Sequence, residues 1–194
     1  MTNTDSLENL RNYLNESATM TADSQLRNYV KTSRLALAGG GGPLSVDLAQ
    51  AQSYIGKEVG LTTWFRVSQK RVNRFAEATG DFQFNQPDRA SVLHENCYTG
   101  TIAHGMLVMS LLPTFATHGT LKIHGTRQNI IYGMDKVRFL NPVRIGSRLR
   151  GRFTLLSAME RGANEVLLRH SVVIEIEGES KPALMTDWLV VSVL

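Results

Sequence analysis

The sequence predicts an α+β fold in which an antiparallel sheet wraps around one long central helix. The first supporting observation is a segment from Thr101 to about Ala116 that is apolar almost all round, as is typical of a helix enclosed by other structure. The second is a series of strand-like segments, separated by short turns, in the last third of the chain. Successive strands joined by short turns pair as an antiparallel sheet. A sheet that curls around a single buried helix is known as a hot-dog fold.

The sheet is expected to contain at least five strands. Segments that alternate in polarity, or that are rich in β-branched and aromatic residues, predict them, at residues 61–67, 129–140, 148–155, 166–176 and 188–193. Asn141-Pro142 and the stretch from Gly178 to Pro182 supply turn residues between them. One long buried helix together with a sheet of at least five strands suggests that the sheet curls around the helix.

A second, amphipathic helix is predicted between the first strand and the buried helix. Ser68 is a suitable N-cap, and Gly80 stands where a left-handed residue ends a helix. One apolar face runs between them at helical spacing, formed by Val72, Phe75, Ala76 and Thr79. Asp81 is therefore the first side chain after the helix ends. In the buried helix, Pro113 removes a backbone donor, so a kink or an end is expected nearby.

Residues 1–50 differ from the rest and predict an N-terminal helical extension that ends in a Gly-rich hinge. Leucine and other apolar residues recur there at helical spacing. The run Gly39-Gly-Gly-Gly-Pro43 lacks the Gly-Lys-Ser/Thr of a phosphate loop, so it is interpreted as a flexible hinge. The expected organisation is an extension over 1–50 and a hot-dog domain over 51–194.

Composition excludes several classes of protein. The 194 residues carry a formal net charge of only +4, which is mild for a nucleic-acid binder. The single cysteine, Cys97, rules out an internal disulfide framework and a Cys-rich zinc site. There is no apolar run of about 18 residues and no secretory signal. These features predict a cytoplasmic protein that binds no nucleic acid and does not insert into a membrane.

The densest basic cluster lies at Arg144, Arg148, Arg150 and Arg152. The last three alternate with Leu149, Gly151 and Phe153, a pattern that indicates the solvent-exposed face of a strand. The alternative is a surface on which a phosphate-bearing ligand lands.

Asp81 is the first candidate for chemistry. It follows a helix C-terminus, where the carbonyl dipoles disfavour a negative charge. Partial burial there would favour the protonated form and suit the carboxyl group to act as a general base. The alternative is a solvated turn residue, because aspartate is common in turns.

The second candidate is the motif Thr99-Gly-Thr-Ile-Ala-His-Gly105, which opens the predicted buried helix. The first N–H groups of a helix have no partner inside it and carry a partial positive charge. Gly105 has no Cβ, so a ligand can approach its backbone. A carbonyl oxygen placed there would be polarised, and an enolate oxygen would be held better still. The alternative is that Thr99 or Thr101 caps the helix while His104 packs locally.

The remaining histidines and Cys97 predict no further site. No pair of histidines has the i, i+4 spacing of a helical metal site, so neither a metal nor a cofactor is expected. His170 lies on an apolar strand face, which is more typical of a satisfied core histidine than of a ligand. Cys97 has no base partner close by in the sequence and is interpreted as a loop residue rather than a nucleophile.

From about Tyr54 to Leu194 the chain resembles the MaoC-like, (R)-specific enoyl-CoA hydratase family, and within it the branch of nodulation protein N. The resemblance rests on five segments: Phe75-Ala-Glu-Ala-Thr-Gly-Asp81, Thr101-Ile-Ala-His-Gly105, Ser110-Leu-Leu-Pro113, Tyr132-Gly-Met-Asp-Lys-Val-Arg-Phe139 and Pro142-Val-Arg-Ile-Gly-Ser147. It implies a hot-dog fold, usually a homodimer, acting on acyl thioesters of coenzyme A or of an acyl carrier protein. Asp81 matches the family aspartate that activates water. Gly105 matches the glycine whose N–H holds the thioester oxygen, and Thr101 and His104, which precede it, are expected to bind substrate with it.

The chain departs from the family pattern at one catalytic position. The family histidine, five residues after the aspartate, falls at Gln86 in the loop Asp81-Phe-Gln-Phe-Asn-Gln86. Imidazole gives and takes a proton near neutral pH, whereas a carboxamide can only orient a water molecule. Loss of a general acid–base partner typically slows a reaction by about 10²–10⁴. His94, in the stretch that follows, is an alternative partner.

Three functions remain open from the sequence. The first is an enoyl-CoA hydratase or 3-hydroxyacyl thioester dehydratase, with Asp81 as base and Gln86 positioning water. The second is a thioesterase, because one carboxylate and a helix-start oxyanion site suffice to hydrolyse an activated acyl group. The third is a non-catalytic protein that binds acyl-CoA or acyl carrier protein.

Overall fold

A computed structural model describes residues 44–82 and 102–194 of the chain. The predicted N-terminal helices and hinge, and the candidates Gln86, His94, Cys97 and Thr101, lie outside the described residues. Within them, the main sheet has six strands, in the order β2-β6-β7-β8-β5, with β3 also paired to β6. Every pairing in this sheet is antiparallel.

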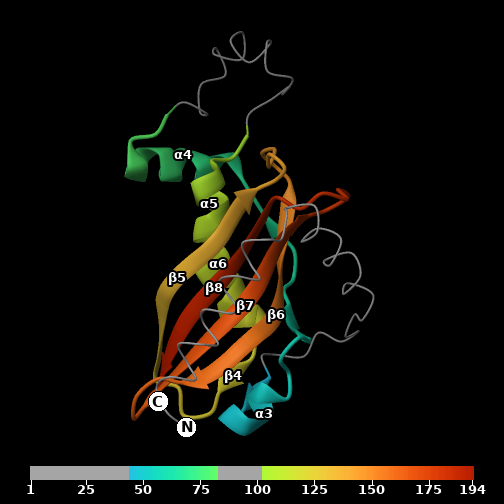
Figure 1. Cartoon of the computed structure of the whole chain (residues 1–194). Helices are drawn as coiled ribbons and strands as arrows, with labels where there is room; N and C mark the ends of the chain where they lie inside the picture. Colours follow the sequence, from blue (N-terminus) through green and yellow to red (C-terminus); the bar gives the residue numbers. More distant parts are fainter. Residues whose placement is uncertain (1–43, 83–101) are drawn as a thin grey trace. The chain divides into compact units, whose positions relative to one another are not determined.

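Four long strands form most of the sheet and confirm the strand predictions in the last third of the chain (Figure 1). They are β5 (Gln128–Phe139), β6 (Arg148–Glu160), β7 (Glu165–Ile176) and β8 (Leu184–Val193). β6 and β8 are each longer than expected. Register shifts occur in the pairing of β5 with β8 and of β6 with β7, and such irregularities bend a strand and increase its twist.

The first predicted strand is interrupted. β2 (Glu58–Leu61) and β3 (Phe65–Arg66) both pair with β6, but they are separate strands. The Thr62 hydroxyl explains part of the break, since its Oγ1 accepts a hydrogen bond of 2.9 Å from the N–H of Gly151. A side-chain oxygen therefore takes an amide that a ladder carbonyl would otherwise hold.

The buried helix is two helices, α5 (Gly105–Ser110) and α6 (Leu112–Gly119), which meet at Leu111. The break next to Pro113 confirms the expected kink. The expected start at Thr101 is wrong. The backbone just before His104 is extended and pairs with the segment around Val143 instead of entering the helix. The N–H of Ala103 donates to the carbonyl of Val143 at 2.8 Å, and Ile102 forms a bridge with Arg144.

The amphipathic helix, α4 (Gln69–Thr79), has the predicted limits. The Ser68 side chain accepts a hydrogen bond from the N–H of Arg71, and Gly80 ends the helix with φ of 71°. A residue with a Cβ is disfavoured at such an angle. Val72 and Ala76 of the predicted apolar face are fully buried and Phe75 is half-buried, whereas Thr79 at its end is exposed.

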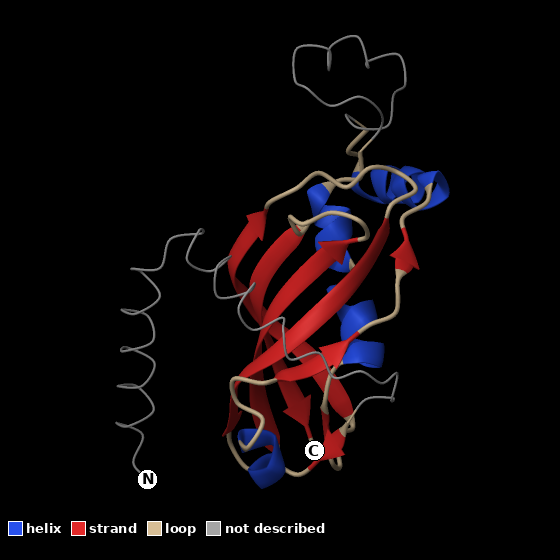
Figure 2. Cartoon of the chain, turned by 90° about the vertical axis from the view of Figure 1, so that its right-hand side faces the viewer, coloured by secondary structure: helices blue, strands red, loops and turns tan. Residues whose placement is uncertain are grey.

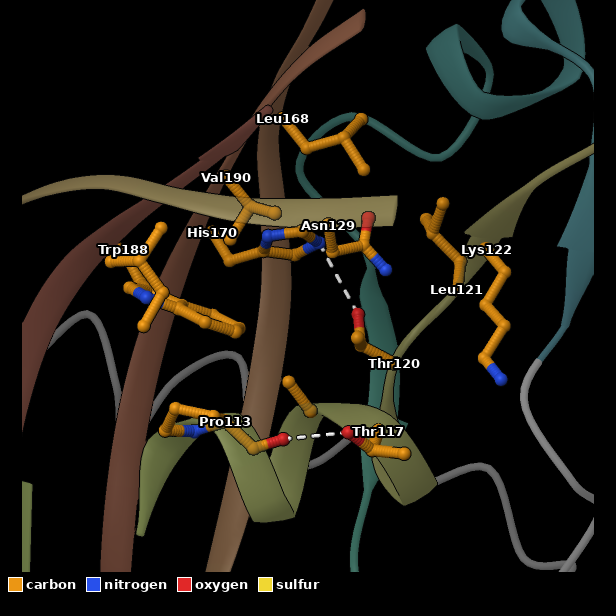
Figure 3. A pocket seen from close by; sticks show the side chains of 12 residues that line it. Pro113, Thr117, Thr120, Leu121, Lys122, Asn129, Leu168, His170, Trp188 and Val190 are labelled. Atoms are coloured by element: carbon orange, nitrogen blue, oxygen red, sulfur yellow. Dashed lines mark hydrogen bonds between the residues drawn. The ribbon is translucent and has the colours of Figure 1, made fainter. Parts of the chain in front are cut away.

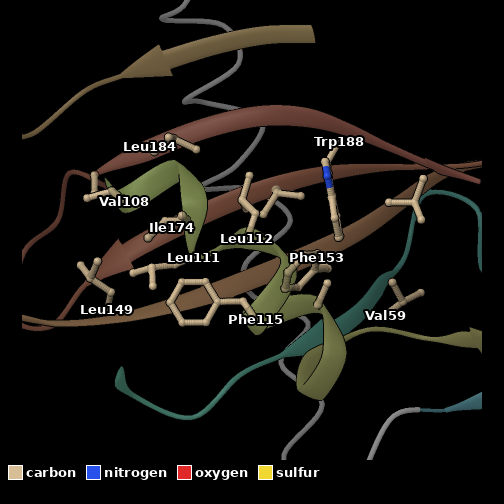
Figure 4. Packing of buried hydrophobic residues seen from close by; sticks show 14 of the residues in the cluster. Val59, Val108, Leu111, Leu112, Phe115, Leu149, Phe153, Ile174, Leu184 and Trp188 are labelled. Carbon is tan, nitrogen blue, oxygen red and sulfur yellow. The ribbon is translucent and has the colours of Figure 1, made fainter. Parts of the chain in front are cut away.

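α5 and α6 lie along one face of the sheet (Figures 1 and 2), and the core forms between them and the strands. Leu112 and Phe115 of α6 face buried side chains of the sheet, among them Leu149, Phe153 and Trp188 (Figure 4). The ring centroids of Phe153 and Trp188 are 6.3 Å apart. A helix surrounded in this way must be apolar on nearly every side, which is the pattern that predicted the fold.

Residues 44–52 pack on the same unit. β1 (Ser45–Val46) pairs in parallel with β4 (Lys122–Ile123), and α3 (Leu48–Gln52) begins with a capping box formed by Asp47 and Gln50. Val46 and Ala51 are buried in the core. In the described ranges, no helix is long and apolar enough to cross a membrane.

Three of the four arginines of the basic cluster, those on β6, are paired with carboxylates. Arg148 contacts Glu177, and Arg150 and Arg152 both contact Glu175. Arg152 also contacts Glu58 on β2 and is only 9% exposed. The prediction of a solvent-exposed strand face is therefore wrong for Arg152, because glutamates on two neighbouring strands cover it. Charges that are paired across strands give no support to a phosphate-binding surface.

Candidate functional site

The end of α4 fixes the position of Asp81. The Thr79 hydroxyl donates to the carbonyl of Phe75 at 2.8 Å, and the same oxygen accepts the N–H of Asp81 at 3.4 Å. Gly80 turns the chain between them with its left-handed backbone. The carboxylate of Asp81 is 38% exposed, so it is held on a rigid element while its oxygens remain accessible to a small molecule.

His104 joins Asp81 to the start of α5. Its side chain is 2% exposed, and its Nε2 lies 2.9 Å from the main-chain oxygen of Asp81. Because a carbonyl oxygen only accepts hydrogen bonds, Nε2 carries the hydrogen. The same nitrogen is 3.9 Å from Oδ2 of Asp81, and the ring packs on Phe75 at 5.3 Å. The structure thus brings together Asp81 and His104, which the sequence proposed as members of one site.

Gly105 is the first residue of α5 and directly follows His104, its N-cap. A Cβ at Gly105 would lie 2.9 Å from Cδ1 of Phe139, which is closer than carbon atoms approach without displacement. The glycine therefore lets the Phe139 ring lie against the backbone. This contact adds a reason for glycine that the motif alone does not reveal. Phe139 itself is 51% exposed, so it forms an outer wall next to the helix start.

A pocket of about 200 Å³ lies between α6 and the sheet (Figure 3). Neither Asp81 nor Gly105 is among its lining residues. One wall is apolar and is formed by Pro113, Ala116, Ile131, Leu168, Trp188 and Val190. Sequence reasoning missed this pocket, because its residues come from α6 and from four strands, β4, β5, β7 and β8, that are distant in the chain.

His170 is a buried histidine on the pocket's other wall. It is 1% exposed, and its Nε2 is 3.2 Å from Oγ1 of Thr120. Burial lowers the pKa of His170 to about 4, so the ring is neutral at pH 7. The sequence correctly placed His170 on an apolar face, but it predicted a satisfied core residue. Nδ1 of His170 has no hydrogen-bond partner among the described residues.

No metal centre is indicated in the part of the chain that is described. Within residues 44–82 and 102–194, no three His, Cys, Asp or Glu side chains gather closely enough to hold an ion. Gln86 and Thr101 belong to the same predicted site as Asp81 but fall in the undescribed segment 83–101.

The fold and the site together define a class of protein. An antiparallel sheet around a central helix, with a carboxylate held at the start of that helix, is the arrangement of a hot-dog domain with a candidate acid–base site. The chain belongs to the MaoC-like domain family, whose model matches residues 50–175.

Relatives support this membership. The chain is 43% identical over 148 residues to nodulation protein N of Rhizobium leguminosarum bv. viciae, covering 75% of this chain and 91% of the relative. It is 38% identical over 146 residues to 3-hydroxyacyl-thioester dehydratase Z of Mycobacterium tuberculosis, covering 74% and 92%. The crystal structure of a MaoC-like dehydratase from Rhodospirillum rubrum has the same fold, with a TM-score of 0.54, 20% identity and coverage of 72% and 92%.

Proposed function

We propose that this chain hydrates 2-enoyl thioesters and dehydrates 3-hydroxyacyl thioesters, with coenzyme A or an acyl carrier protein as the carrier. The observation that carries the proposal is the contact between Asp81 and His104 directly before Gly105. It holds a carboxylate oxygen 3.9 Å from the side chain of the residue that precedes Gly105. Similarity to a 3-hydroxyacyl-thioester dehydratase over three quarters of the chain supports the same reaction.

Asp81 is the general base in this proposal. It takes a proton from water as the water oxygen bonds to the β-carbon and the carbon–carbon π bond breaks, and the protonated Asp81 then gives that proton to the α-carbon. Negative charge moves onto the thioester oxygen during the addition. The N–H of Gly105, at the start of α5, donates to that oxygen, because preorganised donors stabilise developing charge most strongly in a site that excludes water. His104 is a positioning residue, since its contact is with Asp81.

Gln86 takes a limited role in the proposal. Its carboxamide has one acceptor and two donor hydrogens but no proton to exchange near neutral pH. It therefore orients the attacking water and leaves the proton transfers to Asp81. We expect a slower reaction than an aspartate–histidine pair would give, by about 10²–10⁴ where imidazole serves as the second acid–base group.

The pocket beside α6 is the proposed binding site for the acyl tail. Its apolar wall fits hydrocarbon, and concave apolar pockets with a few polar groups are the usual form of small-molecule sites. Pro113 lies eight residues after Gly105, which is at most about 12 Å at the rise of an α-helix, because the chain bends between α5 and α6. A thioester bound at Gly105 would therefore direct a long acyl chain towards this pocket.

The proposed working form is a homodimer. β5 has β8 on one side and no strand on the other among the described residues, so it is an edge strand there. Ile130, Ile131, Tyr132 and Phe139 on this strand are all exposed by 45% or more. An exposed, apolar edge strand favours association with a second chain. Light scattering after size-exclusion chromatography should give twice the chain mass, and a monomer would contradict this part of the proposal.

A panel of trans-2-enoyl-CoA thioesters of increasing chain length tests the proposed reaction. We expect the conjugated thioester absorbance to fall with at least one chain length, with formation of 3-hydroxyacyl-CoA. A thiol reagent in the same assay should detect no free coenzyme A. Release of thiol would favour a thioesterase. A rise in melting temperature with acyl-CoA, without either reaction, would favour a binding protein.

A further inference from the structure

The pocket that receives the acyl tail in the proposed function also has a polar wall. His170, Thr120 and Asn129 lie together there, opposite Pro113 and Thr117 of α6 (Figure 3). Purely hydrocarbon ligands gain nothing from such groups, and burying them without a partner is costly. The composition of this wall therefore carries information about the ligand.

The His170–Thr120 pair keeps unused hydrogen-bonding capacity. Nε2 of His170 and Oγ1 of Thr120 engage each other at 3.2 Å, while Nδ1 of His170 has no partner among the described residues. A neutral imidazole has one donor and one acceptor nitrogen, and a hydroxyl has one donor and two acceptor sites. Whichever tautomer is present, the pair can still both donate and accept.

Asn129 adds a donor to the same wall. Its Oδ1 accepts a hydrogen bond from Oγ of Ser192 at 2.8 Å, which directs the amide nitrogen elsewhere and leaves it able to donate. His170 and Thr120 are both buried, at 1% and 8% exposure. A hydrogen bond formed there competes poorly with water and contributes more than the same bond at the surface.

We infer that the pocket selects acyl chains that carry a neutral hydroxyl group near their far end, which hydrogen-bonds to the His170–Thr120 pair. A hydroxyl both donates and accepts, so it matches the capacity that the pair retains. The inference deepens the proposed function and depends on it for the direction of the chain. The low pKa of His170, about 4 because of burial, supports a neutral partner. Lys122, exposed at the edge of the pocket, is the group that a carboxylate would use.

The geometry sets the length of the chain. Pro113 to Thr117 lie eight to twelve residues after Gly105, or roughly 12–18 Å along the helices. An extended chain advances roughly 1.2 Å per backbone atom, so about ten to fifteen carbons span the distance. Crotonyl-CoA is too short to reach the pocket and provides an internal control.

The test compares three 2-enoyl-CoA substrates of about twelve carbons that end in a methyl, a hydroxyl or a carboxylate group. Wild-type protein should show kcat/KM about five- to tenfold higher for the hydroxyl-terminated chain than for the methyl-terminated chain. This ratio is the effect expected of one buried hydrogen bond. Thr120→Val and His170→Phe should each remove this preference, which is a ratio of two substrates measured on the same variant and so does not depend on the variant's overall rate. Thr120→Val preserves the side-chain volume, so the test can still be made if His170→Phe does not fold.

Equal kcat/KM for the methyl and hydroxyl chains would overturn the inference while leaving the proposed function intact. A preference for the carboxylate chain that Lys122→Met abolishes would overturn it as well. Calorimetry with saturated acyl-CoA analogues of the same length separates the two proposals. Tighter, Thr120-dependent binding of the hydroxyl analogue without turnover of any substrate would retain the inference and reject the reaction. Equal binding without turnover would reject both.

Discussion

The Nε2 of His104 lies 2.9 Å from the main-chain oxygen of Asp81, across 23 positions of sequence. The end of α4 is thereby fixed to the start of α5, and two segments that the sequence singled out separately become one site. His104 is 2% exposed, so it contacts Asp81 from the buried side of that residue. The proposed reaction depends on this contact for the placement of its base.

Replacement of His104 should reduce the rate by displacing Asp81. We expect His104→Ala to lower kcat by about tenfold or more, since a small misplacement of a catalytic group is costly, with a smaller change in KM. His104→Gln offers an N–H donor at a similar distance from the backbone and should recover part of the loss. Steady-state kinetics on one enoyl-CoA substrate measures both. If folded Gln and Ala variants are both as active as wild type, His104 does not position the base.

Replacement of Gly105 by a larger residue should destabilise the protein, because the Phe139 ring occupies the space that a Cβ would need. Gly105→Ala places a methyl group 2.9 Å from the ring, and overpacking of this kind costs about 1–3 kcal/mol. The melting temperature should therefore fall. Phe139→Ala removes the ring, so the double variant should be less destabilised than the sum of the single variants. Additive changes in melting temperature would show that the two residues do not compete for the same space.

Introducing the family histidine should accelerate the reaction. Gln86→His supplies a group that exchanges protons near neutral pH, and the expected gain in kcat lies in the range of about 10²–10⁴ for a second acid–base residue. Gln86→Asn, which keeps the amide, serves as the control. A flat rate for the histidine variant would indicate that the loop has diverged at more than this one position.

His170 should make the protein less stable in acid. Its pKa in the folded chain is about 4, against an ordinary value of 6.5, so the unfolded chain binds a proton that the folded chain does not. The contribution of neutral His170 is complete above pH 6.5 and is lost as the pH falls towards 4, at up to about 1.4 kcal/mol per pH unit. Urea unfolding of wild type and His170→Phe between these values measures the difference. Parallel pH dependence in the two proteins would contradict the assignment.

Features set by local rules were predictable from the sequence. Ser68, the apolar face after it and Gly80 define α4 because capping and helical periodicity involve only neighbouring residues. The long strands and the kink near Pro113 follow for the same reason. The position of Asp81 directly after α4 is a consequence of the same helix-ending signal at Gly80, so it too was predictable.

Features set by distant contacts were not predictable in this way. α5 begins four residues later than expected because Val143 takes the N–H of Ala103, and no local pattern records that pairing. The pocket beside α6 needs residues from four strands to form. The ion pairs of Arg152 depend on Glu58 and Glu175 on neighbouring strands, so alternation alone suggested exposure where the structure has burial.

The most direct test of the proposed reaction is single-turnover hydration of the preferred enoyl-CoA by wild type and Asp81→Asn. Asparagine keeps the shape of the side chain but cannot accept the proton from water. The rate of hydration should fall by at least about 10², while binding of a saturated acyl-CoA analogue stays the same. Hydration by Asp81→Asn at the wild-type rate would show that Asp81 is not the base.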